Sequence, residues 1–128
     1  MVYKPFMKRP LVYIVDDDEA IRDTFAEVLH EFGYETHSYR NGREAVEALE
    51  REERPNLILL DWMMPVMNGA EFVKQNGVAE IPVVVISAVA DSIGNIAGVS
   101  ERIGKPVGLT DLLDTVGRHC YSPKEEGA

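Results

Sequence analysis

The stretch LVYIVDDDEA, residues 11–20, joins five apolar residues to four consecutive acids. The apolar part, residues 11–15, is rich in β-branched side chains and has no alternating polar positions, which is typical of a strand buried on both faces. Carboxylates this close together repel one another, and each loses solvation beside a core. The sequence therefore requires either a compensating cation or solvation of all four acids, Asp16, Asp17, Asp18 and Glu19.

Four other segments have strand character, and helical patterns separate them. The strand-like segments are LILLD (57–61), PVVVISA (82–88), ERIGKP (101–106) and the polar ETHSY (35–39), which we expect at or near an edge. Helical patterns cover residues 18–33, 41–54, 70–75, 91–100 and 109–121. Strand and helix patterns alternate about five times, with connections too long for hairpins. This predicts an α/β fold, a flavodoxin-like doubly wound (βα)5 arrangement with a five-stranded parallel sheet in the order 2-1-3-4-5.

Length and composition favour one soluble domain. The chain has 128 residues, and we expect a domain at 10–121, an N-terminal extension at 1–9 and a disordered tail at 122–128. A net charge of -9 argues against nucleic acid or an anionic membrane as a direct partner. With Cys120 as the single cysteine and no apolar run of signal-peptide or transmembrane length, we expect a cytoplasmic protein.

Polar residues follow the predicted strands at one edge of the sheet. Asp16 and Asp17 follow the first strand, and Asp61 ends the neighbouring one. Ser87 and Lys105 follow the next two strand segments. In a doubly wound sheet, ligands bind beyond the carboxyl ends of the strands, where these five side chains converge. Hard oxygen ligands suit Mg²⁺, and an ammonium group can reach phosphate oxygens, so the pattern indicates phosphoryl-transfer chemistry.

Four motifs in this order resemble the receiver domain of bacterial two-component response regulators. They are IVDDDEA (14–20), LLDWMMPVMNG (59–69), VVVISA (83–88) and IGKP (103–106). No single motif is decisive, but the four together, with compatible spacing, are highly specific. The resemblance covers roughly residues 10–121.

The resemblance implies a phosphoacceptor and a metal site. Asp61 would attack a phosphohistidine on a histidine kinase or a histidine phosphotransfer protein and carry the phosphoryl group. Asp16 and Asp17 would hold Mg²⁺, together with Asp61 and the backbone carbonyl of Met63. Such a domain assists its own phosphorylation and dephosphorylation but turns over no external metabolite. Its output is contact with a downstream protein that the sequence does not name.

The resemblance also gives roles to two other residues. Ser87 would hydrogen-bond a phosphoryl oxygen and report its arrival. Lys105 would pair with Asp61 before transfer and with the phosphoryl group after it. In the family the peptide bond between this lysine and the following proline, Pro106, is usually cis.

The segment after Ser87 departs from the family pattern. Arg102 stands where the family usually has an aromatic ring that moves inward upon phosphorylation. The distance from Ser87 to Lys105 is shorter than usual by about one helical turn, ~4 residues. Gly94 and Gly98 further weaken this segment, because each costs about 1 kcal/mol relative to alanine inside a helix. We therefore predict a short or irregular fourth helix and an unusual partner-binding face.

Met63 and Val89 form a further departure. In the family, the side chains at these two positions tune the access of the hydrolytic water. Both are apolar here. The hypothesis that follows is a slow loss of phosphate and a long-lived phosphoryl state.

Three other readings compete with a phosphorylated receiver. A pseudo-receiver, a protein-binding module without the switch, is favoured by Arg102 and the shortened fourth helix but opposed by the costly acid cluster. A haloacid dehalogenase phosphatase would use Asp16 and Asp18 as its Asp-x-Asp pair, but that motif needs Thr or Val where this chain has Ala20. An EF-hand loop needs glycine where this chain has Ile21. Asp18 and Glu19 are best read as helix-start residues without a metal role.

Overall fold

A computed structural model describes residues 8–121 and shows one parallel sheet. The strands are β1 (Leu11–Val15), β2 (Glu35–Tyr39), β3 (Leu57–Asp61), β4 (Val83–Ser87) and β5 (Glu101–Gly104). Their order is β2-β1-β3-β4-β5, so the predicted fold class and strand order are confirmed. Of the expected extension at 1–9, only Lys8 and Arg9 are described, and the expected tail at 122–128 lies outside the described residues.

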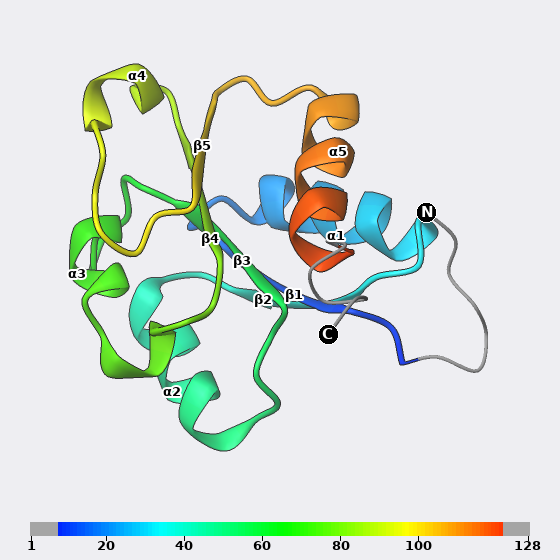
Figure 1. Cartoon of the computed structure of the whole chain (residues 1–128), viewed down its shortest axis with the longest axis horizontal. Coiled ribbons are helices and arrows are strands. Elements are labelled where there is room, and N and C mark those ends of the chain that lie inside the picture. The colour runs from blue at the N-terminus through cyan, green and yellow to red at the C-terminus, as the bar shows by residue number, and fades with distance from the viewer. Residues whose placement is uncertain (1–7, 122–128) are drawn as a thin grey trace.

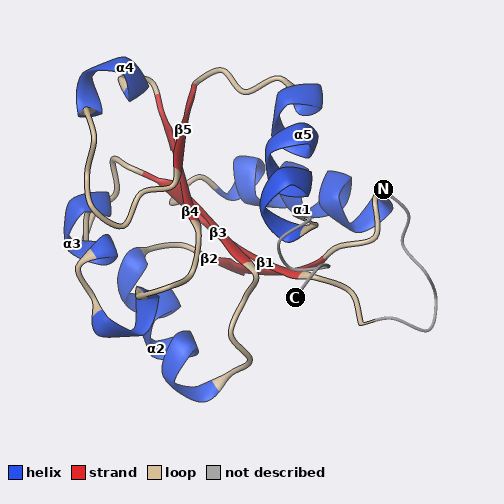
Figure 2. Ribbon diagram, in the orientation of Figure 1, coloured by secondary structure: helices blue, strands red, loops and turns tan. Residues whose placement is uncertain are grey.

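Helices cover both faces of the sheet. They are α1 (Glu19–Glu31), α2 (Gly42–Arg51), α3 (Gly69–Val73), α4 (Ala90–Ile93) and α5 (Leu109–Cys120), with a short 3-10 helix, η1 (Asn76–Val78). Figures 1 and 2 show α1 and α5 on one face and α2 and α3 on the other. Within residues 8–121, no helix combines the length and apolar character that a membrane span needs.

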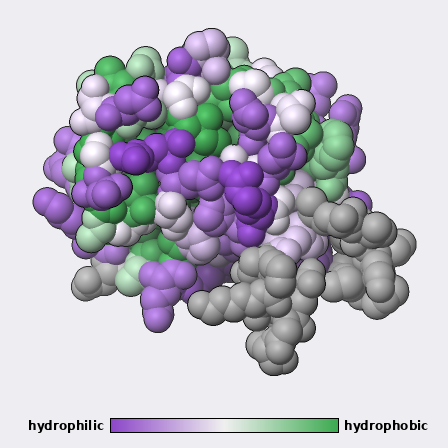
Figure 3. Space-filling view, turned by 45° about the horizontal axis from the view of Figure 1, so that its top comes forward, coloured by the Kyte–Doolittle hydropathy of each residue, from purple (hydrophilic) through white to green (hydrophobic). Residues whose placement is uncertain are grey.

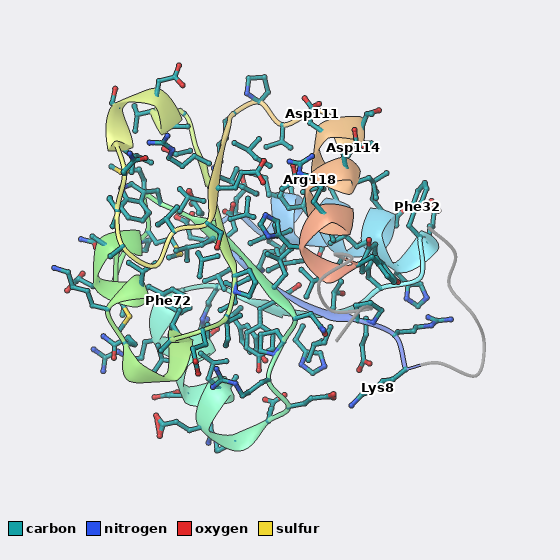
Figure 4. The ribbon with its side chains drawn as sticks, in the orientation of Figure 1. Lys8, Phe32, Phe72, Asp111, Asp114 and Arg118 are labelled. Atoms are coloured by element: carbon teal, nitrogen blue, oxygen red, sulfur yellow. The ribbon has the colours of Figure 1, made fainter. Side chains whose placement is uncertain are left out.

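Each face of the sheet has its own core. Leu29 of α1 and Leu112 and Val116 of α5 pack on one face, against residues such as Ile14 of β1. On the opposite face, α2 supplies three buried residues and α3 supplies Phe72, which Figure 4 labels. Strands β1, β3 and β4 are buried along their whole length because helices cover both faces, which is why they read as uninterrupted apolar runs.

Side-chain caps fix where the helices begin. The Asp18 carboxylate accepts from the N–H groups of Ala20 and Ile21, and this confirms the predicted start of α1. Asn41 likewise caps α2. The sequence reading placed the third helix at 70–75, but α3 begins at Gly69 because Asn68 and Glu71 form a capping box, and it ends at Val73.

The fourth helix is short, as predicted. It contains four residues, has no side-chain cap at its start and is followed directly by Gly94, whose φ is 76°. Gly94 also sits where a side chain would be strained, because positive φ is costly for residues with a Cβ. Arg102, on the adjacent strand β5, donates from Nη1 to the Gly94 carbonyl. The residue that replaces the expected aromatic ring therefore holds the end of α4.

Strand β5 forms one edge of the sheet and is tied to α5 by ion pairs. The Glu101 carboxylate lies 2.5 Å from Arg118 Nη2 and 3.1 Å from His119 Nε2. Figure 4 shows Arg118 on the same helix as the exposed acids Asp111 and Asp114. These contacts position the strand that leads directly into Lys105.

Replacement of Gly69 by alanine tests the packing at the start of α3. A Cβ at Gly69 would lie 2.2 Å from Trp62 Cε3, so the indole ring would have to move. We expect Gly69→Ala to lower the free energy of unfolding by about 1–3 kcal/mol, measured by urea denaturation. The control is Gly104→Ala, which meets nothing within 4 Å and should stay within about 0.5 kcal/mol of the wild type. Equal stabilities for the two variants would contradict this packing.

Candidate functional site

Three carboxylates meet beyond the carboxyl ends of β1 and β3. One oxygen from each of Asp16, Asp17 and Asp61 lies within 4.8 Å of the others. Asp16 is 3% exposed and Asp61 is 5% exposed, whereas Asp17 is exposed to solvent. The strand register explains the convergence, because β1 and β3 pair in parallel and Val15 lies beside Leu60. The acids that the sequence reading grouped are therefore brought together.

Three groups of Asp16 are bonded to the protein. Its backbone N–H donates to the Tyr39 carbonyl at 3.1 Å, and its Oδ1 accepts from the Asp18 N–H at 2.8 Å. Its carbonyl accepts from Arg22 Nη1 at 2.7 Å. The sequence pattern does not predict the contact of Arg22, because a basic residue in a surface helix usually indicates only a solvated face.

Lys105 lies across the two buried acids. Its Nζ is 3.4 Å from Asp61 Oδ1 and 3.8 Å from Asp16 Oδ2. The Lys105 N–H donates to the Ser87 carbonyl at 3.0 Å, which aligns the chain after β5 with the end of β4. The peptide bond between Lys105 and Pro106 is cis, as the resemblance implied.

Ser87 and Met63 approach the same place from β4 and from the loop after β3. Ser87 is 1% exposed, and its Oγ accepts from the Val89 N–H at 3.1 Å. The Met63 N–H lies 3.4 Å from Asp61 Oδ1. The Met63 side chain itself is 69% exposed, and Val89 is 48% exposed. Met63 and Val89 are thus solvent-exposed apolar residues, and each lies two residues after the end of a strand, β3 or β4, that contributes to the site.

The environment of the acids favours their neutral forms. Burial, and next the charge of Asp16, raise the pKa of Asp61 to about 6, although Lys105 and the Met63 N–H oppose the shift. Burial also raises the pKa of Asp16, against the opposing effects of the Asp18 N–H and Lys105. Holding both carboxylates ionised in the folded protein therefore costs free energy.

The residues present fit a magnesium ion. All three candidate ligands are carboxylates, the hard oxygen donors that Mg²⁺ prefers, and no histidine or cysteine belongs to the cluster formed within residues 8–121. Lys105 supplies a single positive charge to three carboxylates. A divalent cation would offset the remaining repulsion.

The pKa of Asp61 predicts how stability depends on pH. Between pH values of about 4 and 6 the folded chain binds more protons at Asp61 than the unfolded chain, so this carboxyl lowers stability as pH rises. Without Mg²⁺ at pH 7, we expect Asp61→Asn to raise the free energy of unfolding by about 1–2 kcal/mol. The gain should shrink toward pH 4 in urea denaturation.

The control for this prediction is Asp114→Asn. It removes the same charge from an exposed position on α5 and should change stability little at either pH. An Asp61→Asn variant no more stable than the wild type at pH 7 would contradict the unfavourable burial of this carboxylate.

Comparison with known proteins identifies the family. The family model described as the response regulator receiver domain matches residues 12–117. The polar-differentiation response regulator DivK of Brucella anthropi is 34% identical over 113 residues, which are 82% of this chain and 91% of DivK. The DNA-binding response regulator MtrA of Mycolicibacterium smegmatis is 30% identical over 125 residues, 94% of this chain and 54% of MtrA. The chain thus spans about half the length of that relative.

The fold agrees with this comparison. The crystal structure of a CheY-like receiver domain protein from Methanospirillum hungatei superimposes with a TM-score of 0.80 at 28% identity, covering 94% of this chain and all of the other. The signal receiver domain of a histidine kinase from Syntrophus aciditrophicus gives a TM-score of 0.78 at 31% identity, over 90% and 92% of the two chains. The family-model match, the relatives and the shared fold together show that this chain belongs to the response regulator receiver domain family.

Proposed function

We propose that the chain is a phosphorylation-dependent signalling switch of a two-component phosphorelay. Asp61 accepts a phosphoryl group from the phosphohistidine of a histidine kinase or a histidine phosphotransfer protein. The observation that carries this proposal is the pair of buried acids, Asp16 and Asp61, with Lys105 Nζ within 4 Å of both. A binding module without chemistry gains nothing from acids whose pKa values are raised by burial.

The proposed transfer is a displacement at phosphorus. A carboxylate oxygen of Asp61 attacks, an O–P bond forms, and the N–P bond to the donor imidazole breaks, with the electron pair going to the ring nitrogen. Asp16, Asp17, Asp61 and the Met63 carbonyl would hold Mg²⁺. When bound, this ion supplies positive charge that offsets the repulsion between a phosphoryl group and the carboxylates.

Lys105 and Ser87 stabilise the product in this proposal. Lys105 lies 3.4 Å from Asp61 Oδ1 and can follow the negative charge onto the phosphoryl oxygens. The Ser87 Oγ accepts from the Val89 N–H, which leaves the hydroxyl proton available for a phosphoryl oxygen. A shift of Ser87 toward the phosphoryl group would therefore pull on the loop that leads into α4.

The alternative is a phosphorylation-independent pseudo-receiver that binds a protein partner. Its support is the four-residue α4 and the position of Arg102, which bonds to the end of α4 where the family usually has a mobile aromatic ring. Both features concern how a signal leaves the site, and neither removes a side chain from the site itself. The two functions differ in whether Asp61 is modified.

We propose that the output is contact with another protein and that the domain acts in the cytoplasm. MtrA is described as a DNA-binding response regulator, but the match spans 54% of MtrA, so that activity is not carried over. A net charge of -9 opposes direct contact with nucleic acid or an anionic membrane. The face in Figure 3 mixes apolar and polar residues, which is compatible with a protein partner.

Intact mass spectrometry tests the phosphoacceptor. The protein is incubated with a small-molecule phosphodonor, with and without Mg²⁺, beside the Asp61→Asn variant. We expect the mass of one phosphoryl group to be added to the wild type in the presence of Mg²⁺ only, and no addition to the variant. A folded wild type that gains no mass would favour the pseudo-receiver instead.

Because Met63 and Val89 are apolar, we predict that phosphorylated Asp61 loses its phosphoryl group slowly. Met63 and Val89 are 69% and 48% exposed, so they can shield the phosphoryl group from water without being part of the core. We expect Met63→Asn to raise the rate constant of phosphate loss several-fold, because an amide can orient a water molecule. The rate is measured by the decay of the phosphorylated mass, with Met63→Leu as the apolar control. An unchanged rate in Met63→Asn would contradict this role.

A further inference from the structure

Arg22 connects the helix after the acids to the strand end that carries them. It lies in α1, six residues after Asp16, and its Nη1 donates to the Asp16 carbonyl at 2.7 Å. The contact joins the guanidinium to a backbone carbonyl of the sheet edge, while Lys105 is the partner of the Asp16 carboxylate. Arg22 lies outside the four family motifs, the nearest of which ends at residue 20.

The turn that Arg22 closes contains two candidate metal ligands. Asp16 is held at its N–H by Tyr39 and at its Oδ1 by the Asp18 N–H. Without Arg22, the peptide group between Asp16 and Asp17 would lose the hydrogen bond from the guanidinium to its carbonyl oxygen. This peptide group sets the relative direction of the two carboxylates, because it is the link between their Cα atoms.

The positive charge of Arg22 also acts on α2. The pKa of the Glu44 carboxyl is lowered, chiefly by the bond from the Arg40 N–H, and the positive charge of Arg22 contributes to the shift. The bond to the Asp16 carbonyl limits the orientations of this long side chain, which distinguishes Arg22 from a freely solvated arginine.

We infer that Arg22 is a positioning residue for the divalent-cation site, because its guanidinium fixes the peptide group between Asp16 and Asp17. This inference rests on the proposed Mg²⁺ site. A positioning role and a purely electrostatic role of Arg22 predict opposite changes in Mg²⁺ affinity when this residue is removed. Removal of a cation near three carboxylates should strengthen Mg²⁺ binding by Coulomb's law, whereas loss of the brace should weaken it.

The test is the dissociation constant for Mg²⁺, measured without any phosphodonor. Trp62 is the single tryptophan and directly follows Asp61, so its fluorescence reports binding at this site. We expect Arg22→Ala to raise the dissociation constant about tenfold or more, the range typical of removing a group that orients a metal ligand. Arg22→Lys, which retains a donor, should lie between the alanine variant and the wild type.

Two controls separate positioning from loss of charge and from unfolding. Arg51→Ala removes one positive charge at the C-terminal end of α2 and should leave the dissociation constant for Mg²⁺ unchanged. Each variant is measured well below its melting temperature, and Arg22→Met, which keeps the aliphatic stem, replaces the alanine variant if that variant does not fold.

The outcomes distinguish this inference from the proposed function. A wild type whose fluorescence does not respond to Mg²⁺ would overturn both. A responsive wild type with an unchanged or lower dissociation constant in Arg22→Ala would overturn the positioning role alone. Equal weakening in Arg51→Ala would also overturn it, because the effect would then not depend on the bond between Arg22 and the Asp16 carbonyl.

Discussion

Repulsion between the carboxylates of Asp16, Asp17 and Asp61 is the constraint on which the rest of this structure depends. Two of the three are at least 95% buried, and burial together with their proximity raises the pKa of Asp61 to about 6. Lys105 lies close to both buried acids but brings a single positive charge. The fold thus contains a sheet edge that attracts cations, and the cost in stability of burying its carboxylates is the physical basis of the proposed function.

Helices packed on both faces of the sheet support the edge that carries these acids. Separate cores under α1 and α5 and under α2 and α3 bury the central strands along their length, so the strand ends have little freedom. The backbone N–H, the carboxylate and the backbone carbonyl of Asp16 each form a hydrogen bond, and the donor to the carbonyl is Arg22. Helix α4, in contrast, has four residues and no side-chain cap at its start, and Arg102 donates a hydrogen bond to the Gly94 carbonyl after its last residue. A well-bonded site beside a weakly built helix is compatible with the proposed switch, because segments of low local stability are the ones that move.

Much of the fold could be predicted from the sequence, because alternating buried strands and helices allow few topologies. The strand order, the Asp18 cap and the short α4 follow from apolar runs, capping residues and glycines. The convergence of Asp16, Asp17 and Asp61 follows from the rule that parallel strands end at one edge. Hydrogen bonds between side chains and other elements could not be predicted from the sequence. Its patterns do not show that Arg22 bonds to the Asp16 carbonyl or that Arg102 bonds to the Gly94 carbonyl. The start of α3 was misplaced by one residue, because Asn68 was not recognised as a cap.

The most direct measurement is the free energy of unfolding at pH 7 as a function of Mg²⁺ concentration, for the wild type and for Asp61→Asn. If the acids form a cation site in the folded state alone, the wild type gains stability with the logarithm of Mg²⁺ concentration once the site begins to fill. The variant, in which one of the repelling carboxylates is already neutral, should gain much less. A wild type whose stability does not respond to Mg²⁺, or a variant that responds equally, would contradict the proposal that a divalent cation offsets the repulsion at this site.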